Sequence, residues 1–277
     1  MSAHSPKPTS KVTVRSRTLG RRLRIARERR QISGRSLAMR LGWPHTSISF
    51  YETGSRTPKI EDVGAILATL HVTGKEREEI LTLARNAAEP SWLPGVSESM
   101  AGVIECETAA TRIAEWSHTV IPGLLQTAAY ARALYTAVGV PDDEIASRLA
   151  MRMNRRKILE RPRAVPFVAL IGEFALREPI CSPEVMRRQR EHLVKMSGRD
   201  NVEIRIVRSG IGWHPGLAGA FVLYTFNDQD PVVYNEHYRA GSFNPDPQLT
   251  QGYFAAVDRL VSLAETPEDS REMIRST

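Results

Sequence analysis

The segment at residues 44–53, PHTSISFYET, has two kinds of side chain arranged at helical spacing. On a helix, Ile48 and Tyr51 fall on one side together with the preceding Trp43, and we expect them to pack inward. The opposite side carries His45, Thr46, Ser49 and Phe50. Hydroxyl and imidazole groups can exchange hydrogen bonds with the edges of base pairs, and an aromatic ring can pack on a thymine methyl. This face therefore predicts readout of duplex DNA in the major groove.

Polar and basic residues on both sides of this segment extend the candidate interface. Arg56 and Lys59 lie in the loop that follows, and with Ser47 and Ser55 they are placed to hold phosphate groups. Phosphate contacts set the register of a protein on DNA without reading sequence. With Ser33 and Arg35 added, the predicted DNA-binding residues are Ser33, Arg35, His45, Thr46, Ser47, Ser49, Phe50, Ser55, Arg56 and Lys59.

The distribution of charge supports a polyanionic partner. Residues 1–90 carry a formal charge of +9 and residues 91–277 a charge of −2, which together give the net +7 of the chain. Ten basic residues against a single acidic one lie within residues 1–31. A basic end on a nearly neutral body is typical of a nucleic-acid-binding module.

Five short helices must position these residues. The first follows Thr18 and buries Leu19 and Leu23, and the second follows Ser33 and stops at Gly42. The third covers 44–53 and ends at Gly54, the fourth runs from Pro58 to about Leu70, and the fifth follows Thr73. The short turn at Gly42 between two such helices predicts a helix-turn-helix in an all-α domain.

The chain as a whole is predicted to be multidomain. Residues 1–16 form a flexible basic arm, 17–88 the helical domain, 89–99 a linker with two prolines, and 100–277 a second domain. In that second domain we expect helices at 124–138, 142–160, 183–197 and 247–265 and strands at 166–176, 202–207, 219–226 and 232–236. Because these strands mostly follow one another, an α+β domain with a mostly antiparallel sheet is favoured.

Catalytic chemistry is not predicted. The candidate acid-base groups and nucleophiles are Glu173, His192, His214, His237, Cys106 and Cys181. None has the spacing of a metal site, and no G-x-S-x-G or phosphate-binding loop is present, so we expect no enzyme activity, no cofactor and no metal. The two cysteines cannot form a disulfide framework, and no apolar run is long enough to span a bilayer. These observations favour a cytoplasmic protein, associated with the nucleoid when bound to DNA.

Two features of the second domain are open to two interpretations. The loop GWHPGLAG at 212–219 is either a structural turn or the edge of a pocket for a ligand or partner, lined by Trp213 and His214. The basic residues Arg152, Arg155 and Arg156 either form a solvated helix face or hold an anionic ligand or acidic partner.

The first domain resembles the DNA-binding domain of the lambda-repressor and Cro family, the Xre-type regulators. The matching segments are LGRRLRIARERR at 19–30, SLAMRLGW at 36–43, TSISFYETG at 46–54 and RTP at 56–58. The resemblance implies that Arg27 pairs with Glu52 as a structural brace. The sequence departs from the family at Phe50, where a long polar side chain is common, and at Ser36, where Glu or Gln is common.

The second domain resembles one found in actinobacterial regulators of the WhiJ-like group. The matching segments include IPGLLQTAAYARAL at 121–134, IGEFALREPI at 171–180 and GWHPGLAGAFVLYTF at 212–226. The resemblance implies a transcriptional regulator that is often encoded beside a small partner protein.

Together these observations predict a sequence-specific transcriptional regulator, with repression as the favoured sense. We expect it to bind a double-stranded DNA operator as a homodimer, because two half-sites multiply a small number of base contacts. The second domain would dimerise and sense a small protein or ligand. Two alternatives remain open: an antitoxin-like protein that captures a small cognate protein and uses DNA binding for autoregulation, and a small-molecule receptor.

Overall fold

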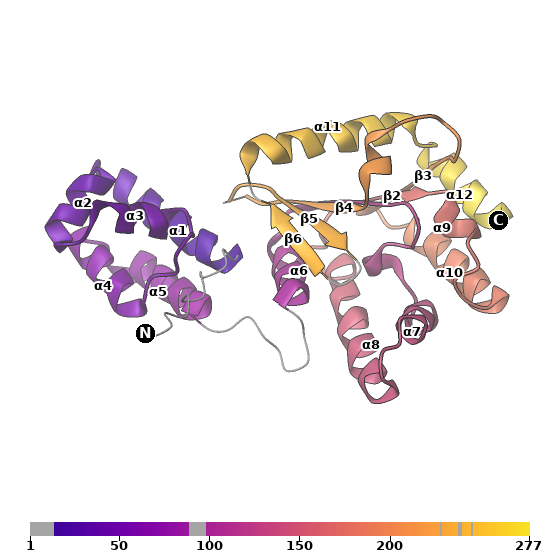
Figure 1. Ribbon diagram of the computed structural model, residues 1–277, viewed down its shortest axis with the longest axis horizontal. Helices are drawn as coiled ribbons and strands as arrows, with labels where there is room; N and C mark the ends of the chain where they lie inside the picture. The colour runs from indigo at the N-terminus through magenta and orange to yellow at the C-terminus, as the bar shows by residue number, and fades with distance from the viewer. Residues whose placement is uncertain (1–13, 89–97, 228, 238–239, 245) are drawn as a thin grey trace, which may run out of the picture. The chain divides into compact units, whose positions relative to one another are not determined.

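The computed structural model describes residues 14–88, 98–227, 229–237, 240–244 and 246–277. It divides into two compact units, Met1–Gly102 and Val103–Thr277, each with an apolar core of its own (Figure 1). The predicted linker at 89–99 and the predicted arm at 1–16 lie largely outside the described residues. In the part that is described, no helix is long and apolar enough to cross a membrane.

The first unit contains the five helices that the sequence predicts. They are α1 (Val14–Glu28), α2 (Gly34–Leu41), α3 (His45–Glu52), α4 (Ile60–Thr69) and α5 (Gly74–Ala88). Helix α1 covers Val14–Glu28 and has Thr18 in its interior, so the expectation that Thr18 caps it is wrong. Ser16 explains part of the difference: it is buried, and its hydroxyl donates to the Gly54 carbonyl at 3.0 Å.

Local sequence sets both ends of α2. The Ser33 hydroxyl accepts a hydrogen bond from the Ser36 N–H at 3.1 Å, which satisfies one free donor of the first turn. At the other end Gly42 takes a left-handed conformation with φ of +66°, which glycine adopts without steric cost. The chain then turns directly into α3, as a helix-turn-helix requires.

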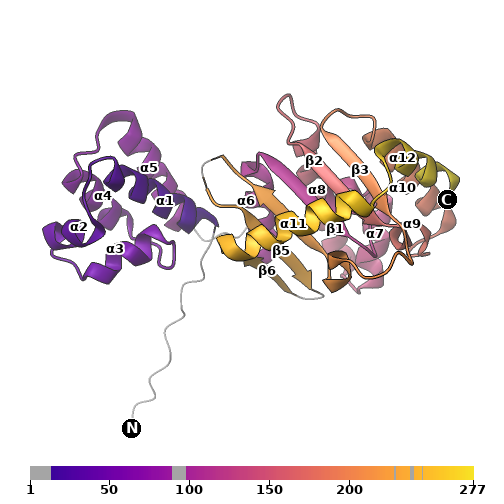
Figure 2. The same cartoon turned by 90° about the horizontal axis from the view of Figure 1, so that it is seen from above.

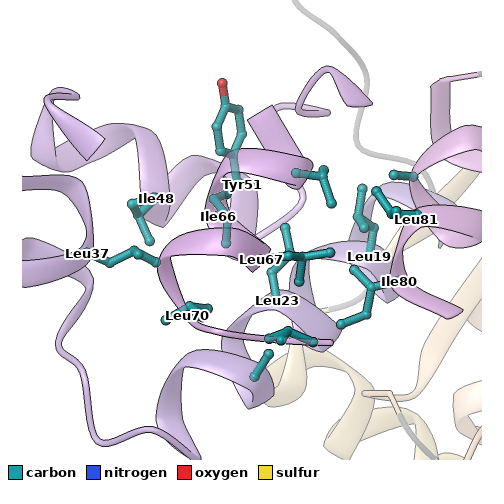
Figure 3. Packing of buried hydrophobic residues seen from close by; sticks show 14 of the residues in the cluster. Leu19, Leu23, Leu37, Ile48, Tyr51, Ile66, Leu67, Leu70, Ile80 and Leu81 are labelled. Carbon is teal, nitrogen blue, oxygen red and sulfur yellow. The ribbon is translucent and has the colours of Figure 1, made fainter. Parts of the chain in front are cut away.

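One apolar cluster holds the five helices together. Figure 3 shows Leu19 and Leu23 of α1, Ile48 and Tyr51 of α3 and residues of α4 and α5 meeting in this cluster. Leu19, Leu23 and Ile48 expose 2% of their surface or less, so they are fully withdrawn from water. The orientation of α3 is therefore set by its packing on α1 and α2.

The second unit is built on a six-stranded mixed sheet. The strands are β1 (Arg112–Ser117), β2 (Phe167–Gly172), β3 (Val202–Val207), β4 (Phe221–Thr225), β5 (Val232–His237) and β6 (Ala240–Asn244). Their order is β3-β2-β1-β4-β5-β6. β1, β2 and β3 are parallel to one another, whereas β4, β5 and β6 continue the sheet in antiparallel pairs. This is the α+β architecture with more antiparallel than parallel strand pairs that the sequence predicts.

Helices cover both faces of this sheet. They are α6 (Glu98–Ala109), α7 (Ala128–Ala137), α8 (Asp142–Arg156), α9 (Phe174–Arg177), α10 (Pro183–Met196), α11 (Pro247–Leu263) and α12 (Pro267–Ser276). In Figures 1 and 2, α11 runs along one face, while α7 and α8 lie on the other. An apolar cluster between α11 and the sheet includes Trp116, Phe221 and Leu260.

Several of the expected elements of the second unit need correction. The strand predicted over 166–176 ends at Gly172, and Phe174–Arg177 is the short helix α9. The first and last strands, β1 and β6, and the helices α6 and α12 were not predicted. The sequence does not predict β1 because Glu115 interrupts the apolar residues of this strand. The helix expected over 124–138 separates into the 3-10 helix η1 (Gly123–Leu125) and α7.

Candidate nucleic-acid interface

Helix α3 presents two chemically different faces. Ile48 and Tyr51 are buried, as their spacing predicts. The opposite side carries side chains that are all exposed: His45, Thr46, Ser49 and Phe50. Ser47, one of the predicted phosphate contacts, is half-buried. An exposed row of hydroxyl, imidazole and aromatic groups on a short helix has the dimensions to enter a major groove.

A two-point ion pair fixes the far end of α3. Arg27 of α1 donates from Nε to Glu52 Oε1 at 2.6 Å and from Nη2 to Glu52 Oε2 at 2.8 Å. Its Nη1 donates to the Ile32 carbonyl at 2.8 Å. The hydrogen bond to Glu52 raises the Arg27 pKa, although partial burial opposes this. The structure thus contains the pair that the family resemblance implies, with all three guanidinium nitrogens occupied within the unit.

A close approach between backbones adds to this bracing. A Cβ atom built on Gly20 of α1 would lie 2.3 Å from the Tyr51 carbonyl oxygen and 2.7 Å from that of Glu52. Only a residue without a side chain fits there. Tyr51 also donates its hydroxyl hydrogen to Asp62 of α4 at 3.1 Å, and burial followed by this contact raises its pKa. The end of α3 is thus held from two sides.

The loop after α3 is ordered by the helix itself. The Arg56 N–H donates to the Phe50 carbonyl at 3.1 Å, and the Thr53 hydroxyl contacts the Ser55 hydroxyl at 2.8 Å. Lys59 caps α4, and its N–H donates to Asp62 Oδ2 at 3.3 Å. These contacts use backbone and hydroxyl groups, so the charged ends of Arg56 and Lys59 remain exposed.

Several cations of the first unit are already paired with acidic side chains, and the predicted DNA contacts are not. Arg22, Arg24 and Arg27 of α1 form ion pairs with Glu79, Glu28 and Glu52 respectively. Arg29 and Arg30, which follow α1, both approach Glu76. By contrast, within residues 14–88 the predicted DNA contacts Arg35, Arg56 and Lys59 form no ion pair with an acidic side chain. These three cations on α2 and on the loop after α3 are therefore available to a phosphate backbone, which the sequence count alone did not show.

In the second unit, the loop between β3 and β4 places its two singled-out residues on opposite sides. Trp213 is 80% exposed, whereas His214 is buried and packs edge-to-face on Trp116 at 5.7 Å between ring centroids. Burial, followed by the proximity of His118, lowers the His214 pKa. Trp116 also donates from Nε1 to the Gly216 carbonyl at 2.8 Å. These contacts make the loop a fixed turn between two strands.

Each of the three predicted pocket arginines of α8 has a hydrogen-bond or ion-pair partner within the second unit. Arg152 donates to the Tyr135 hydroxyl at 2.9 Å and to Gln126 Oε1 at 2.6 Å. Arg155 forms a two-point pair with Glu107 at 2.9 and 2.6 Å, and Arg156 lies 3.4 Å from Glu160. These partners do not belong to the loop that carries Trp213 and His214. A pocket shared by the arginines and that loop stays a prediction.

Sequence reasoning missed the charged cluster around Arg155. Glu107 is buried at 3% exposure, and Glu115 of β1 faces the same region, where burial and the nearby Glu107 raise its pKa to about 8. Burial lowers the pKa of Arg155, but Glu107 more than offsets this effect. A signal was present in the sequence: Glu115 stands directly between the apolar residues Ala114 and Trp116.

Three of the other candidates for chemistry, Glu173, Cys106 and Cys181, are partly or fully buried in the second unit. Glu173 accepts from the Ser209 N–H at 3.0 Å and pairs with Arg177 at 2.7 Å. Cys106 is fully buried, and burial raises the pKa of Cys181. In the part of the chain that the structure describes, no three His, Cys, Asp or Glu side chains come together as a metal site would require.

The turn at Gly42, the exposed face of α3 and the unneutralised cations beside it define a helix-turn-helix DNA-binding domain. Comparison with known proteins agrees, since residues 18–80 match the family described as a helix-turn-helix domain. Residues 100–276 match a second family, described as a domain of unknown function, DUF5753. That match covers more than half of the chain, and the protein belongs to this family. No curated protein and no solved structure matches the chain.

Proposed function

We propose that the protein is a sequence-specific transcriptional repressor that binds operator DNA through the outer face of α3. The observation that carries this proposal is the contrast around α3. Its exposed side chains carry hydroxyl, imidazole and aromatic groups, while the cations Arg35, Arg56 and Lys59 beside it have no acidic partner in residues 14–88. Such an arrangement separates base readout on the helix from phosphate contact at its margins.

The test is selection of bound sequences from a random DNA library with the full-length chain. A triple variant with His45, Thr46 and Ser49 replaced by alanine should lose sequence preference and keep salt-dependent binding to all DNA. Replacing Arg35, Arg56 and Lys59 should weaken binding to every sequence, and the slope of affinity against salt should fall by about 0.9 per lost phosphate contact. Arg24→Ala is the matched control, because Arg24 is also exposed but pairs with Glu28.

These two variants can contradict the proposal separately. If the triple variant on α3 keeps full preference for the selected sequence, α3 is not the reading element. If the selection returns no preferred sequence, the protein is not a specific regulator. An operator that overlaps a promoter, with transcription reduced on addition of the protein, would establish repression.

A homodimer is the second part of the proposal. The eight residues of α3 offer few base contacts, and two half-sites separated by about one helical turn multiply the affinity. We assign dimerisation to residues 100–277. Sedimentation of the full chain, together with footprinting that shows two protected half-sites, tests this assignment; a monomer bound to a single half-site would contradict it.

The second unit is proposed to sense a small protein or ligand without catalysing a reaction. Trp213 supports the capture of a protein partner, because the loop holds this large aromatic side chain 80% exposed while neighbouring His214 anchors it. Purification of the native protein from its own cells, with Trp213→Ala as the control, tests partner capture. A stoichiometric small protein lost in the variant favours the antitoxin-like function, and a bound metabolite seen by native mass spectrometry favours a receptor.

A further inference from the structure

We propose that Phe50 reads the C5-methyl group of thymine in the operator, so that the protein prefers a thymine at one position of each half-site. The proposal rests on the proposed function and names the base that one residue of α3 selects. Phe50 lies on the exposed face of α3 with His45, Thr46 and Ser49.

The exposure of Phe50 is the first observation. Its side chain is 49% exposed, although the same helix buries Ile48 almost completely. In the described residues 14–88, Met39 of α2 is the other large apolar side chain that is exposed. The first unit thus has a complete apolar core and leaves an aromatic ring in water on the face that is proposed to enter the groove.

The chemistry of the neighbouring side chains is the second observation. Guanine is commonly read by two hydrogen bonds from Arg or Lys, and adenine by two from Asn or Gln. The sequence of α3, HTSISFYE, contains none of these four residue types. The hydroxyl and imidazole groups of this face can form hydrogen bonds with more than one kind of base. The side chain that can favour one base is therefore the apolar ring of Phe50. Thymine is the unmodified base that presents a methyl group in the major groove.

The backbone around Phe50 is the third observation, because it fixes the position from which the side chain projects. The Phe50 carbonyl accepts from the Arg56 N–H at 3.1 Å and from the Thr53 hydroxyl at 3.3 Å. The Thr53 hydroxyl also donates to the Ser49 carbonyl at 2.8 Å. With Tyr51 buried and Glu52 paired to Arg27, little freedom remains at this end of the helix. Because the backbone at Phe50 is already ordered, contact of its side chain with a methyl group costs little further backbone entropy.

Thr46 is the competing reader on the same face. It lies four residues before Phe50, so the two side chains are neighbours one turn apart. Its own methyl group could contact thymine in place of the ring. Thr46→Ser removes that methyl and keeps the hydroxyl, which provides a matched test of the two residues.

The experiment uses the full-length chain and the operator obtained by selection. Each thymine is replaced in turn by uracil, which removes the methyl and leaves every hydrogen-bonding group in place. We expect one position in each half-site where uracil weakens binding about 4-fold, the value of one buried methyl-sized group. At that position Phe50→Ala should bind thymine and uracil equally, whereas Thr46→Ser and Met39→Ala should keep the preference. Unfolding curves of Phe50→Ala should match those of the parent because the ring is not part of the core.

Each outcome decides the matter. Equal binding of all thymine and uracil operators by the parent protein overturns the inference. A preference for thymine over uracil that survives in Phe50→Ala also overturns the inference. If this preference is lost only in Thr46→Ser, Thr46 is the residue that reads the methyl group. In these cases a preferred sequence still exists and the proposed function stands. A selection with no preferred sequence removes the proposed function itself, and is recognised before any uracil is introduced.

Discussion

In the described residues of each unit, a largely buried arginine forms two hydrogen bonds with a glutamate, and the two pairs have different surroundings. Arg27 and Glu52 have side-chain exposures of 12% and 11%, and Arg155 and Glu107 of 11% and 4%. The shortest N–O distance is 2.6 Å in both. Arg27 also bonds to the Ile32 carbonyl and lies 3.7 Å from Glu28, which pairs with Arg24, so two cations face two carboxylates and the charges balance.

The pair in the second unit is not balanced. Burial raises the pKa of Glu115, and the nearby Glu107 carboxylate raises it further, to about 8. Tyr224 of β4 belongs to the same region, and its pKa is raised by burial and by Glu107. An Arg–Glu pair with two hydrogen bonds is therefore part of a fixed brace in the first unit and part of a titratable cluster in the second.

Breaking the pair in the second unit should have the largest effect. Arg155→Met leaves Glu107 buried without a counter-ion, and we expect the free energy of unfolding of the second unit to fall by about 3–5 kcal/mol. Denaturant-dependent hydrogen exchange of the full chain, resolved by peptide, assigns the loss to this unit. The double variant Glu107→Gln with Arg155→Met should recover much of the stability. If the double variant is no better than the single one, lost packing and not the uncompensated charge explains the effect.

The titratable character of the cluster gives a pH prediction. Between pH 4.5 and about 8 the folded protein keeps the Glu115 proton that the unfolded chain releases, so the stability of the second unit should decrease as pH rises. The expected decrease is on the order of 2–4 kcal/mol. Glu115→Gln, which imitates the protonated acid, should remove this contribution and be the more stable protein above pH 8.

The difference between parent and Glu115→Gln is the quantity to measure. Half-buried His192 and buried His214 have lowered pKa values and contribute the opposite slope, but their contribution is common to both proteins and cancels. Unfolding curves of both proteins at pH 5, 7 and 9 give this difference. A constant difference across the range would show that Glu115 does not titrate in the folded state.

The brace in the first unit should be the next most sensitive. Arg27→Met is expected to cost about 2–3 kcal/mol, because Glu52 loses its charged hydrogen-bond partner. DNA binding should weaken in parallel, although Arg27 is directed into the unit. Arg24→Ala removes an exposed pair with Glu28 and should cost less than about 1 kcal/mol. Equal losses in the two variants would mean that the Arg27 pair does not brace α3.

Two glycines test the brace with the smallest changes. Gly20→Ala would bring its Cβ to 2.3 Å from the Tyr51 carbonyl, so it should destabilise the first unit by about 1–3 kcal/mol. Gly64→Ala on α4 meets no atom within 4 Å and should stabilise the unit by about 0.5–1 kcal/mol, as expected for alanine in a helix. Thermal unfolding of both variants measures whether each is more or less stable than the parent. A change in the same direction for both would contradict the close approach of α1 and α3.

The sequence was most informative where periodicity and capping act locally. Ser33, Gly42 and the spacing of Ile48 and Tyr51 predict α2, the turn and the two faces of α3, because each depends on residues within one or two turns. It was less informative where a contact spans the chain. The separation of paired from unpaired cations depends on Glu76 and Glu79 of α5 lying beside α1, and local pattern does not show that arrangement.

In the second unit, too, the sequence was less informative about contacts between residues that are far apart along the chain. The antiparallel half of the sheet was predicted from strands that follow one another, whereas β1 pairs in parallel with β2 across a connection of about fifty residues. Glu115 gives β1 the pattern of a surface segment, and only the pairing with β2 and β4 explains its place inside the sheet. The partners of Arg152 and Arg155 were likewise hidden because they lie far away along the chain.

The division of α3 into two faces also has an evolutionary consequence. His45, Thr46, Ser49 and Phe50 are absent from the apolar cluster, and the brace uses Glu52, Tyr51 and backbone atoms. Mutations at the four exposed positions therefore carry little folding penalty, since surface substitutions usually change stability by less than about 0.5 kcal/mol. Gene duplicates of this chain could acquire new operators one residue at a time while every intermediate stays folded. The core and the brace of α3 would then stay the same, while the exposed residues of α3 change.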